Sequence, residues 1–226
     1  MSDQYITLIA SLPPHLPNLF ATKQTPLSQI KLDERLQMLE QQDANDLAVI
    51  ENLLYWDCMA MDTFDAEMIK RGLQAEKQID NEFIKKIVLW RLEERTFTAA
   101  LRRRHLGQSA PMLNEKWGFG RWLQQITTHW NEASFGLAEQ FPWLAEAEML
   151  LQEQNYLGLE RLLLARVWDH YGRVVGAHYF DFEAVVVYVL RWDVIDRWSH
   201  YNIDKAEKRF NEMATSALGD YARMFA

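Results

Sequence analysis

Apolar residues recur every three or four positions through most of the chain from residue 32 onward, and this spacing predicts an all-α protein. The two clearest segments are residues 83–107 and 180–204. The same reasoning predicts shorter helices at 45–61, 64–72, 117–130, 143–154, 155–175 and 205–218. Residues 5–12 form an apolar run that fits either a strand or a buried helical turn, because periodicity does not separate the two. Any strand is therefore expected only in the first dozen residues.

A glycine-containing segment at residues 107–120 is the best candidate for a hinge between two helical halves. The N-terminal half, 1–110, holds the helix predicted at 83–107, and the C-terminal half, 111–226, holds the one predicted at 180–204. We therefore expect an irregular helical bundle built from two halves.

Both long helices interrupt their apolar stripe with charged side chains. In the first, Glu94 follows Ile87 and Trp90 at helical spacing, and in the second Asp193 and Arg197 follow the apolar positions. A buried charge costs several kcal/mol unless it is paired. These helices must therefore pair with each other, with neighbours or with another protein. The residues expected in structural ion pairs or at an interface are Arg91, Glu94, Arg95, Arg102, Arg103, Arg104, Glu183, Asp193, Asp196 and Arg197.

Internal ion pairs, including one between Asp193 and Arg197, are the preferred interpretation of these charges, and interface contacts come second. The net charge of −8 argues against a nucleic-acid-binding protein. The charge is uneven, since residues 83–123 carry +6 between acidic segments of −8 and −6. The run Arg102–Arg104 either complements the dipole at a helix end or forms a docking patch for an acidic partner.

Motifs for catalysis, nucleotide binding or metal binding are absent from the sequence, so we expect a non-catalytic protein without cofactor or resident metal. The nearest approach to a metal cluster is Asp169, His170, His178 and Asp181. Histidines near a helix C-terminus, favoured there by the dipole, are the simpler explanation. The single cysteine, Cys58, fits a reducing compartment. Apolar runs are too short for a membrane helix, so no direct membrane insertion is expected.

Three stretches of the chain resemble one known family. The start, YITLIASLP, is similar to the opening of a bacterial family of uncharacterised proteins encoded beside V/A-type ATPase subunits. The stretch LEERTFTAALRRRHLG resembles that family's helix ending in an arginine-rich turn, with Thr96 where the family pattern has asparagine. The pair LERLLLARVWDHY and YFDFEAVVVYVLRWDVIDRW resembles its C-terminal helices.

That family is similar in turn to the V/A-type ATPase C subunit, the central-stalk d subunit, through a pattern near Phe180, Glu183, Val185 and Tyr188. The resemblance implies an all-helical, C-subunit-like socket that seats the rotating stalk on the membrane ring, although this chain has room for about two of the three helical repeats. It implies a non-catalytic peripheral subunit or assembly factor whose partners are the central stalk and rotor ring. Its location would be cytoplasmic, peripheral to the inner membrane. The alternatives are a small all-helical hydrolase or metal-dependent enzyme, and an unrelated protein-interaction module.

Overall fold

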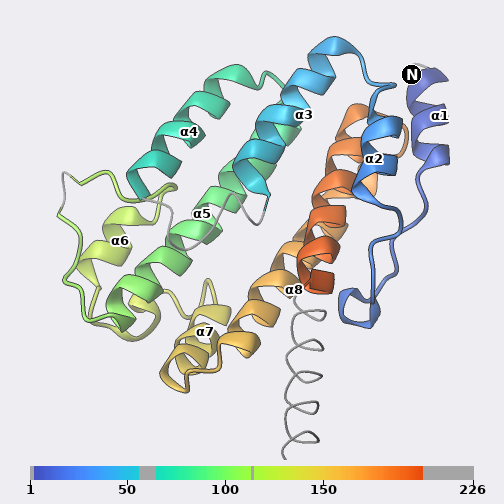
Figure 1. The fold of residues 1–226 in the computed structure, drawn as a ribbon. Coiled ribbons are helices and arrows are strands. Elements are labelled where there is room, and N and C mark those ends of the chain that lie inside the picture. The colour runs from blue at the N-terminus through green and yellow to red at the C-terminus, as the bar shows by residue number, and fades with distance from the viewer. Residues whose placement is uncertain (1–2, 56–64, 113–114, 201–226) are drawn as a thin grey trace, which may run out of the picture.

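The computed structural model describes residues 3–55, 65–112 and 115–200, and every regular element in these ranges is helical (Figure 1). The α-helices are α1 (Asp3–Ser11), α2 (Gln29–Leu36), α3 (Gln41–Leu54), α4 (Asp65–Gln78), α5 (Glu82–His105), α6 (Leu123–Thr128), α7 (Trp143–Gln152), α8 (Tyr156–Val174) and a last helix whose described part covers 182–200. Short 3₁₀ turns lie at Leu19–Ala21, Ala133–Gly136 and Val175–Ala177. The expected all-α class is therefore confirmed for the described residues.

The longest helix, α5, begins and ends close to where its sequence pattern predicts. Asn81 caps its start, because the Asn81 side chain accepts hydrogen bonds from the backbone N–H groups of Phe83 and Ile84 at 3.0 and 3.2 Å. The helix ends just before Gly107, which adopts the left-handed conformation with φ +73°. Among the described residues, no helix is both long enough and apolar enough to cross a lipid bilayer.

Helices that follow one another along the chain pack side by side, α3 on α4, α4 on α5 and α7 on α8 (Figure 1). Their apolar faces form two buried clusters. The larger cluster combines residues between 8 and 92 with residues between 164 and 198, and the smaller one lies between 97 and 159. Helix α5 belongs to both, since Leu92 is buried in the larger and Phe97 in the smaller. The core thus crosses residue 110, where the sequence suggested a boundary between halves.

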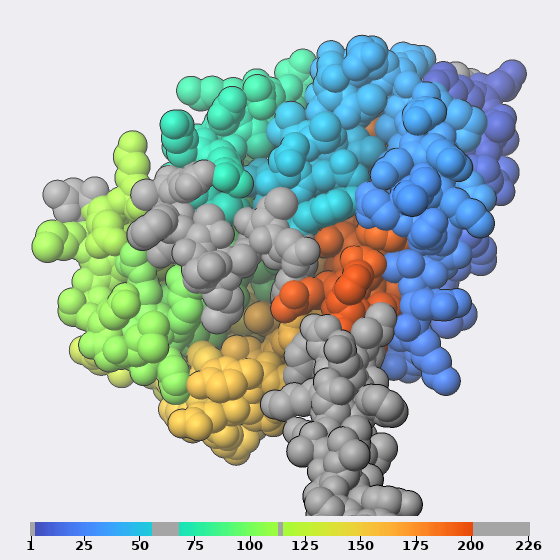
Figure 2. Space-filling view, viewed as in Figure 1, coloured from blue at the N-terminus to red at the C-terminus, as the bar shows by residue number. Residues whose placement is uncertain are grey.

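The N-terminal segment lies against the C-terminal helix, far from it in sequence (Figure 2). The indole of Trp192 donates to the carbonyl of Leu27 at 2.9 Å, and the Tyr188 hydroxyl donates to the carbonyl of Pro13 at 2.8 Å. These bonds satisfy loop carbonyls that burial would otherwise leave unpaired. They explain how an irregular loop packs against a buried helix.

Several predicted boundaries are wrong. Residues 5–12 lie in α1 and its C-terminal end, so the helical alternative holds there. The helix predicted at 45–61 begins earlier, at Gln41, and the Asp43 carboxylate in its first turn accepts a hydrogen bond from the Tyr5 hydroxyl. The helix predicted to end at Gly72 continues to Gln78. The predicted helix 117–130 is reduced to α6.

Gly72 has a packing reason for its place inside α4. A Cβ atom at this position would lie 2.4 Å from Phe119 Cζ and 2.9 Å from Leu92 Cδ1. The missing side chain therefore admits the Phe119 ring, and glycine marks a close contact rather than a helix end. The helix predicted at 205–218, the end of the one predicted at 45–61, and Cys58 lie outside the described residues.

Candidate functional site

The charge that interrupts the apolar stripe of α5 is paired inside the protein. Glu94 is only 5% exposed, and its two carboxylate oxygens accept hydrogen bonds from Arg166 Nη2 and Nε of α8 at 2.8 and 3.0 Å. The Arg166 guanidinium also lies over the Trp143 ring, 4.3 Å from its centroid. Two parallel bonds of this kind are the strongest form of ion pair between side chains. They link the middle of α5 to α8.

One turn earlier on α5, Arg91 is also buried and faces Tyr171 of α8. Burial is the main reason that the pKa of Tyr171 rises to about 12, and the charge of Asp193 on the last helix acts in the same direction. A hydrogen bond with Arg91 and its positive charge act the opposite way. Side chains from three helices therefore interact in one interior region, with Arg91 and Asp193 both near Tyr171.

On the last helix, Arg197 contacts α8. Its Nε lies 2.8 Å from Glu160 Oε1, and the Arg197 side chain is 38% exposed. The sequence does not indicate Glu160 as a partner of Arg197, because a pairing across 37 positions leaves no spacing signal within either helix. Asp196 lies next to His200, with 3.2 Å between Asp196 Oδ2 and His200 Nδ1.

At the basic end of α5, Arg104 makes its contacts within the fold. Arg104 Nη1 donates to the carbonyls of Trp130 and Glu132 at 3.0 and 2.6 Å, and Arg104 Nη2 lies 2.8 Å from Glu148 Oε1. Its guanidinium stands 4.1 Å from the ring centroid of Phe135. Arg104 is thus a structural residue that joins α5 to α7 and to the turn between α6 and α7.

The neighbouring arginines of α5 are half-buried as Arg104 is. Both terminal nitrogens of Arg103 lie 3.1 Å from Glu115 Oε1, and the Glu115 side chain is 40% exposed. Arg95 and Arg102 are half-buried on the same helix. The two adjacent arginines therefore differ in their partners, since Arg104 joins separate elements of the fold and Arg103 pairs with an exposed carboxylate.

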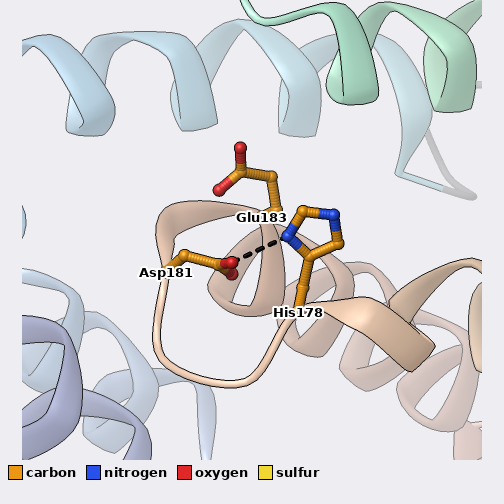
Figure 3. A group of neighbouring side chains, drawn as sticks. All are labelled: His178, Asp181 and Glu183. Carbon is orange, nitrogen blue, oxygen red and sulfur yellow. Dashed lines mark hydrogen bonds and ion pairs between the residues drawn. The ribbon is translucent and has the colours of Figure 1, made fainter. Parts of the chain in front are cut away.

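A second constellation lies at the start of the last helix (Figure 3). His178, Asp181 and Glu183 each offer one potential metal ligand atom, and these atoms lie within 4.8 Å of one another. His178 Nδ1 is 2.7 Å from Asp181 Oδ2. All three residues are half-buried. Within the described chain this is the group whose composition and spacing suit a metal ion.

The grouping suggested by the sequence was different. His170 is not part of this group, because its ring stacks on Trp90 with 3.5 Å between centroids and 4° between planes. Burial, followed by the charges of Arg173, Arg166 and Arg91, lowers the pKa of His170 to about 4. Asp169 is also outside the group. The turn at Val175–Ala177 separates His170 on α8 from His178, so a shared helix face does not exist.

Comparison with known proteins gives one result. The model of the family described as "Protein of unknown function (DUF2764)" matches residues 61–217. The chain belongs to this family. The DUF2764 match takes in α5, α8 and the last helix, and thus the Glu94–Arg166 pair and His178, Asp181 and Glu183. Helices α1 to α3 precede it. No curated protein and no solved structure matches the chain.

Proposed function

We propose that this protein is a non-catalytic peripheral subunit or assembly factor of a bacterial V/A-type ATPase, linking the central stalk to the membrane rotor ring. The proposal starts from the three sequence stretches that resemble the family encoded beside these ATPases. It places the protein on the cytoplasmic side, peripheral to the inner membrane through the complex. A C-subunit-like role implies contacts with proteins rather than turnover of a substrate.

The observation that carries the proposal is the Glu94–Arg166 pair. A protein that transmits force between two partners must resist sliding of its helices. The two-point pair fixes α8 against α5, and Arg197 with Glu160 ties the last helix to α8. Helix α5 spans about 36 Å at 1.5 Å per residue, enough to cross a small domain. Three helices joined by ion pairs form a body suited to a mechanical link.

The exposed end of α5 is the surface we assign to a partner. Leu106 is 64% exposed and Met112 is 74% exposed, next to the pair of Arg103 with the exposed Glu115. Apolar side chains rimmed by charge are typical of a protein contact. The charged rim would steer association with an acidic stalk or ring surface, and salt would weaken this steering.

Co-purification tests this function. An affinity-tagged chain, expressed in its source cells and isolated from gently solubilised membranes, should bring stalk and rotor-ring subunits with it. Leu106→Asp or Met112→Asp should reduce their recovery without lowering the melting temperature. Ile30→Asp is the matched control, since Ile30 is 71% exposed and belongs to α2, a helix that lies away from the C-terminal end of α5 (Figure 1). Its recovery should equal that of the wild type.

Recovery of no ATPase subunit with the wild-type chain would overturn the proposal. Recovery that Leu106→Asp, Met112→Asp and Ile30→Asp leave equally intact would reject the end of α5 as the contact. Two other outcomes would support a different function. Capture of unrelated proteins alone would favour an independent interaction module. Metal-dependent turnover lost with His178→Gln would favour an enzyme, for which His178, Asp181 and Glu183 are the supporting observation.

A further inference from the structure

The group formed by His178, Asp181 and Glu183 combines ligand types that a sequence motif did not reveal. One imidazole and two carboxylates come from a short segment that turns from α8 into the last helix (Figure 3). Imidazole nitrogen suits transition metals such as Zn²⁺, whereas Mg²⁺ and Ca²⁺ prefer oxygen ligands alone. The donor set therefore selects for a transition metal.

Each of the three side chains is also held in place by a contact outside the group. The His178 ring packs on Phe83, with 4.3 Å between centroids. Asp181 Oδ1 accepts the backbone N–H of Ala184 at 2.9 Å, which leaves Oδ2 toward His178. The Asn81 amide donates to Glu183 Oε1 at 2.9 Å. Such supporting contacts orient metal ligands in known sites.

Asn81 makes this support more specific. Its side-chain oxygen caps α5, and the nitrogen of the same amide group reaches Glu183 across 102 positions of sequence. The start of α5 and the start of the last helix are therefore joined at the group. An ion bound there would reinforce the same junction.

The surroundings are rich in negative charge. Burial, followed by the charges of Asp46 and Glu183, raises the pKa of Asp43. Burial also raises the pKa of Asp46, and Asp80 contributes further. Carboxylates from α3 and from the turn before α5 are thus close enough to affect one another and Glu183. A cation at His178 would relieve this repulsion.

We propose that His178, Asp181 and Glu183 bind one divalent transition-metal ion of the Zn²⁺ type. Zn–N and Zn–O bonds of about 2.0–2.2 Å place neighbouring ligands roughly 3.3 Å apart in a tetrahedral site. The three ligand atoms, within 4.8 Å of one another, need only a small movement to reach this spacing. The ion takes the place of the hydrogen bond between His178 Nδ1 and Asp181 Oδ2, and their 2.7 Å separation opens slightly.

A second histidine–carboxylate pair in the protein serves as a comparison for His178 and Asp181. His129 Nδ1 lies 2.8 Å from Glu132 Oε1, in a histidine–carboxylate pair with the same i,i+3 spacing as His178 and Asp181. No further carboxylate joins His129 and Glu132 within ligand distance in the described chain. His129→Gln is therefore a matched control for His178→Gln.

The test uses untagged full-length protein, freed of metal by a chelator and titrated with Zn²⁺ in a calorimeter. We expect saturable binding of one equivalent and a higher melting temperature in its presence, with no such effect from Mg²⁺. Co²⁺ should give visible absorption bands, a direct sign of protein ligands. His178→Gln and Glu183→Gln should each weaken binding at least ~10-fold, since loss of even an outer supporting contact costs about 10–100-fold.

Two further variants separate binding from folding. Asp181→Asn keeps an oxygen to cap the last helix but removes the charge, and Asn81→Ser keeps a cap for α5 but removes the donor to Glu183. Both should weaken Zn²⁺ binding while the metal-free melting temperature changes little. Absence of a one-equivalent site in the wild type, or equal binding by His178→Gln and His129→Gln, would overturn the proposal.

Discussion

Glu94 on α5 and Arg166 on α8 lie 72 positions apart in the chain, yet their side chains meet in a two-point ion pair with distances of 2.8 and 3.0 Å. The planar guanidinium matches the carboxylate only in a narrow range of orientations. The pair therefore selects one arrangement of α5 on α8, whereas apolar contacts alone would tolerate several. This is the structural reason for a charge on an otherwise apolar helix face.

Removal of one partner should leave the other uncompensated. We expect Glu94→Ala to lower the free energy of unfolding by about 3–5 kcal/mol, the usual cost of breaking a buried pair. Glu82→Ala on the same helix is the control, since the Glu82–Lys85 pair is exposed and worth only ~0–1 kcal/mol. Denaturant titration of both variants, of Arg166→Ala and of the Glu94→Ala, Arg166→Ala double mutant measures the coupling energy of the pair. A loss no greater than that of Glu82→Ala would mean that the pair does not stabilise the fold.

Arg104 should contribute more than Arg103 to the free energy of unfolding, although the two residues are adjacent. Arg104 binds the turn in which Ser134 and Phe135 adopt positive φ angles of 51° and 55°, a conformation that costs energy for residues other than glycine. We expect Arg104→Gln to lower the free energy of unfolding by about 2 kcal/mol, within the range for hydrogen bonds to charged groups. Arg103→Gln should cost less than ~1 kcal/mol, since its partner Glu115 is exposed and solvent screens the pair.

Equal effects of the Arg103 and Arg104 substitutions would contradict this division. Because Arg104 stabilises the fold, replacement of Arg102, Arg103 and Arg104 together would change both stability and docking. Arg103→Gln alone is the cleaner test of electrostatic steering, because the structure predicts little change in its melting temperature. The expected effect is slower association with the ATPase and a weaker dependence on salt.

The sequence predicts the helices that carry their own local signals. Helix α5 combines a cap at Asn81, a periodic apolar face and a glycine stop, and its bounds are nearly as predicted. Gly72 misleads because its role depends on Phe119, which is 47 residues away in the chain and adjacent in space. Residues 117–122 mislead for a similar reason. Their aromatic content suggests a helix, yet buried Trp117 lies in an irregular segment packed on α5.

For the site, the sequence identifies one member of each important pair. Glu94 and Arg197 are visible as charges on apolar stripes, while the sequence does not single out their partners Arg166 and Glu160, whose contacts depend on how α8 packs. The group of His178, Asp181 and Glu183 is likewise only partly visible in the sequence. His178 and Asp181 are apparent as neighbours, but the third member, Glu183, is oriented by Asn81 from a distant helix start. Pairings across the chain leave no mark in local spacing.

Thr96 is expected to secure the end of segment 107–120, the hinge candidate in the sequence. Its hydroxyl donates to the carbonyl of Leu92 at 2.9 Å and accepts the backbone N–H of Phe119 at 2.7 Å. Thr96→Val preserves the shape but leaves the Phe119 N–H without this acceptor. We expect a loss of about 1–3 kcal/mol, the cost of an unsatisfied buried group. Thr98→Val, two residues further along α5, is the control, because the Thr98 hydroxyl bonds only within α5 in the described contacts. Hydrogen exchange at Phe119 should also accelerate in Thr96→Val alone.

His170 should make stability depend on pH in a defined window. Its ring stacks on Trp90, and burial, followed by nearby arginines, lowers its pKa to about 4 from the ordinary value of 6.5. Between these two values the unfolded chain binds a proton that the folded protein does not, so stability falls as pH decreases from ~6.5 to ~4 and the loss levels off below. His170→Phe keeps an aromatic ring on Trp90 and removes the titration.

Other titrating groups, including buried His15 with its pKa near 3, are present in both the wild type and His170→Phe, so their contributions to the pH dependence cancel in the comparison. The free energy of unfolding of the wild type, measured relative to His170→Phe, should therefore be constant above pH 7 and decrease steadily toward pH 4. Parallel curves for the two proteins would show that His170 is protonated in the folded state as easily as in the unfolded chain, and the stack on Trp90 would then have no part in acid sensitivity.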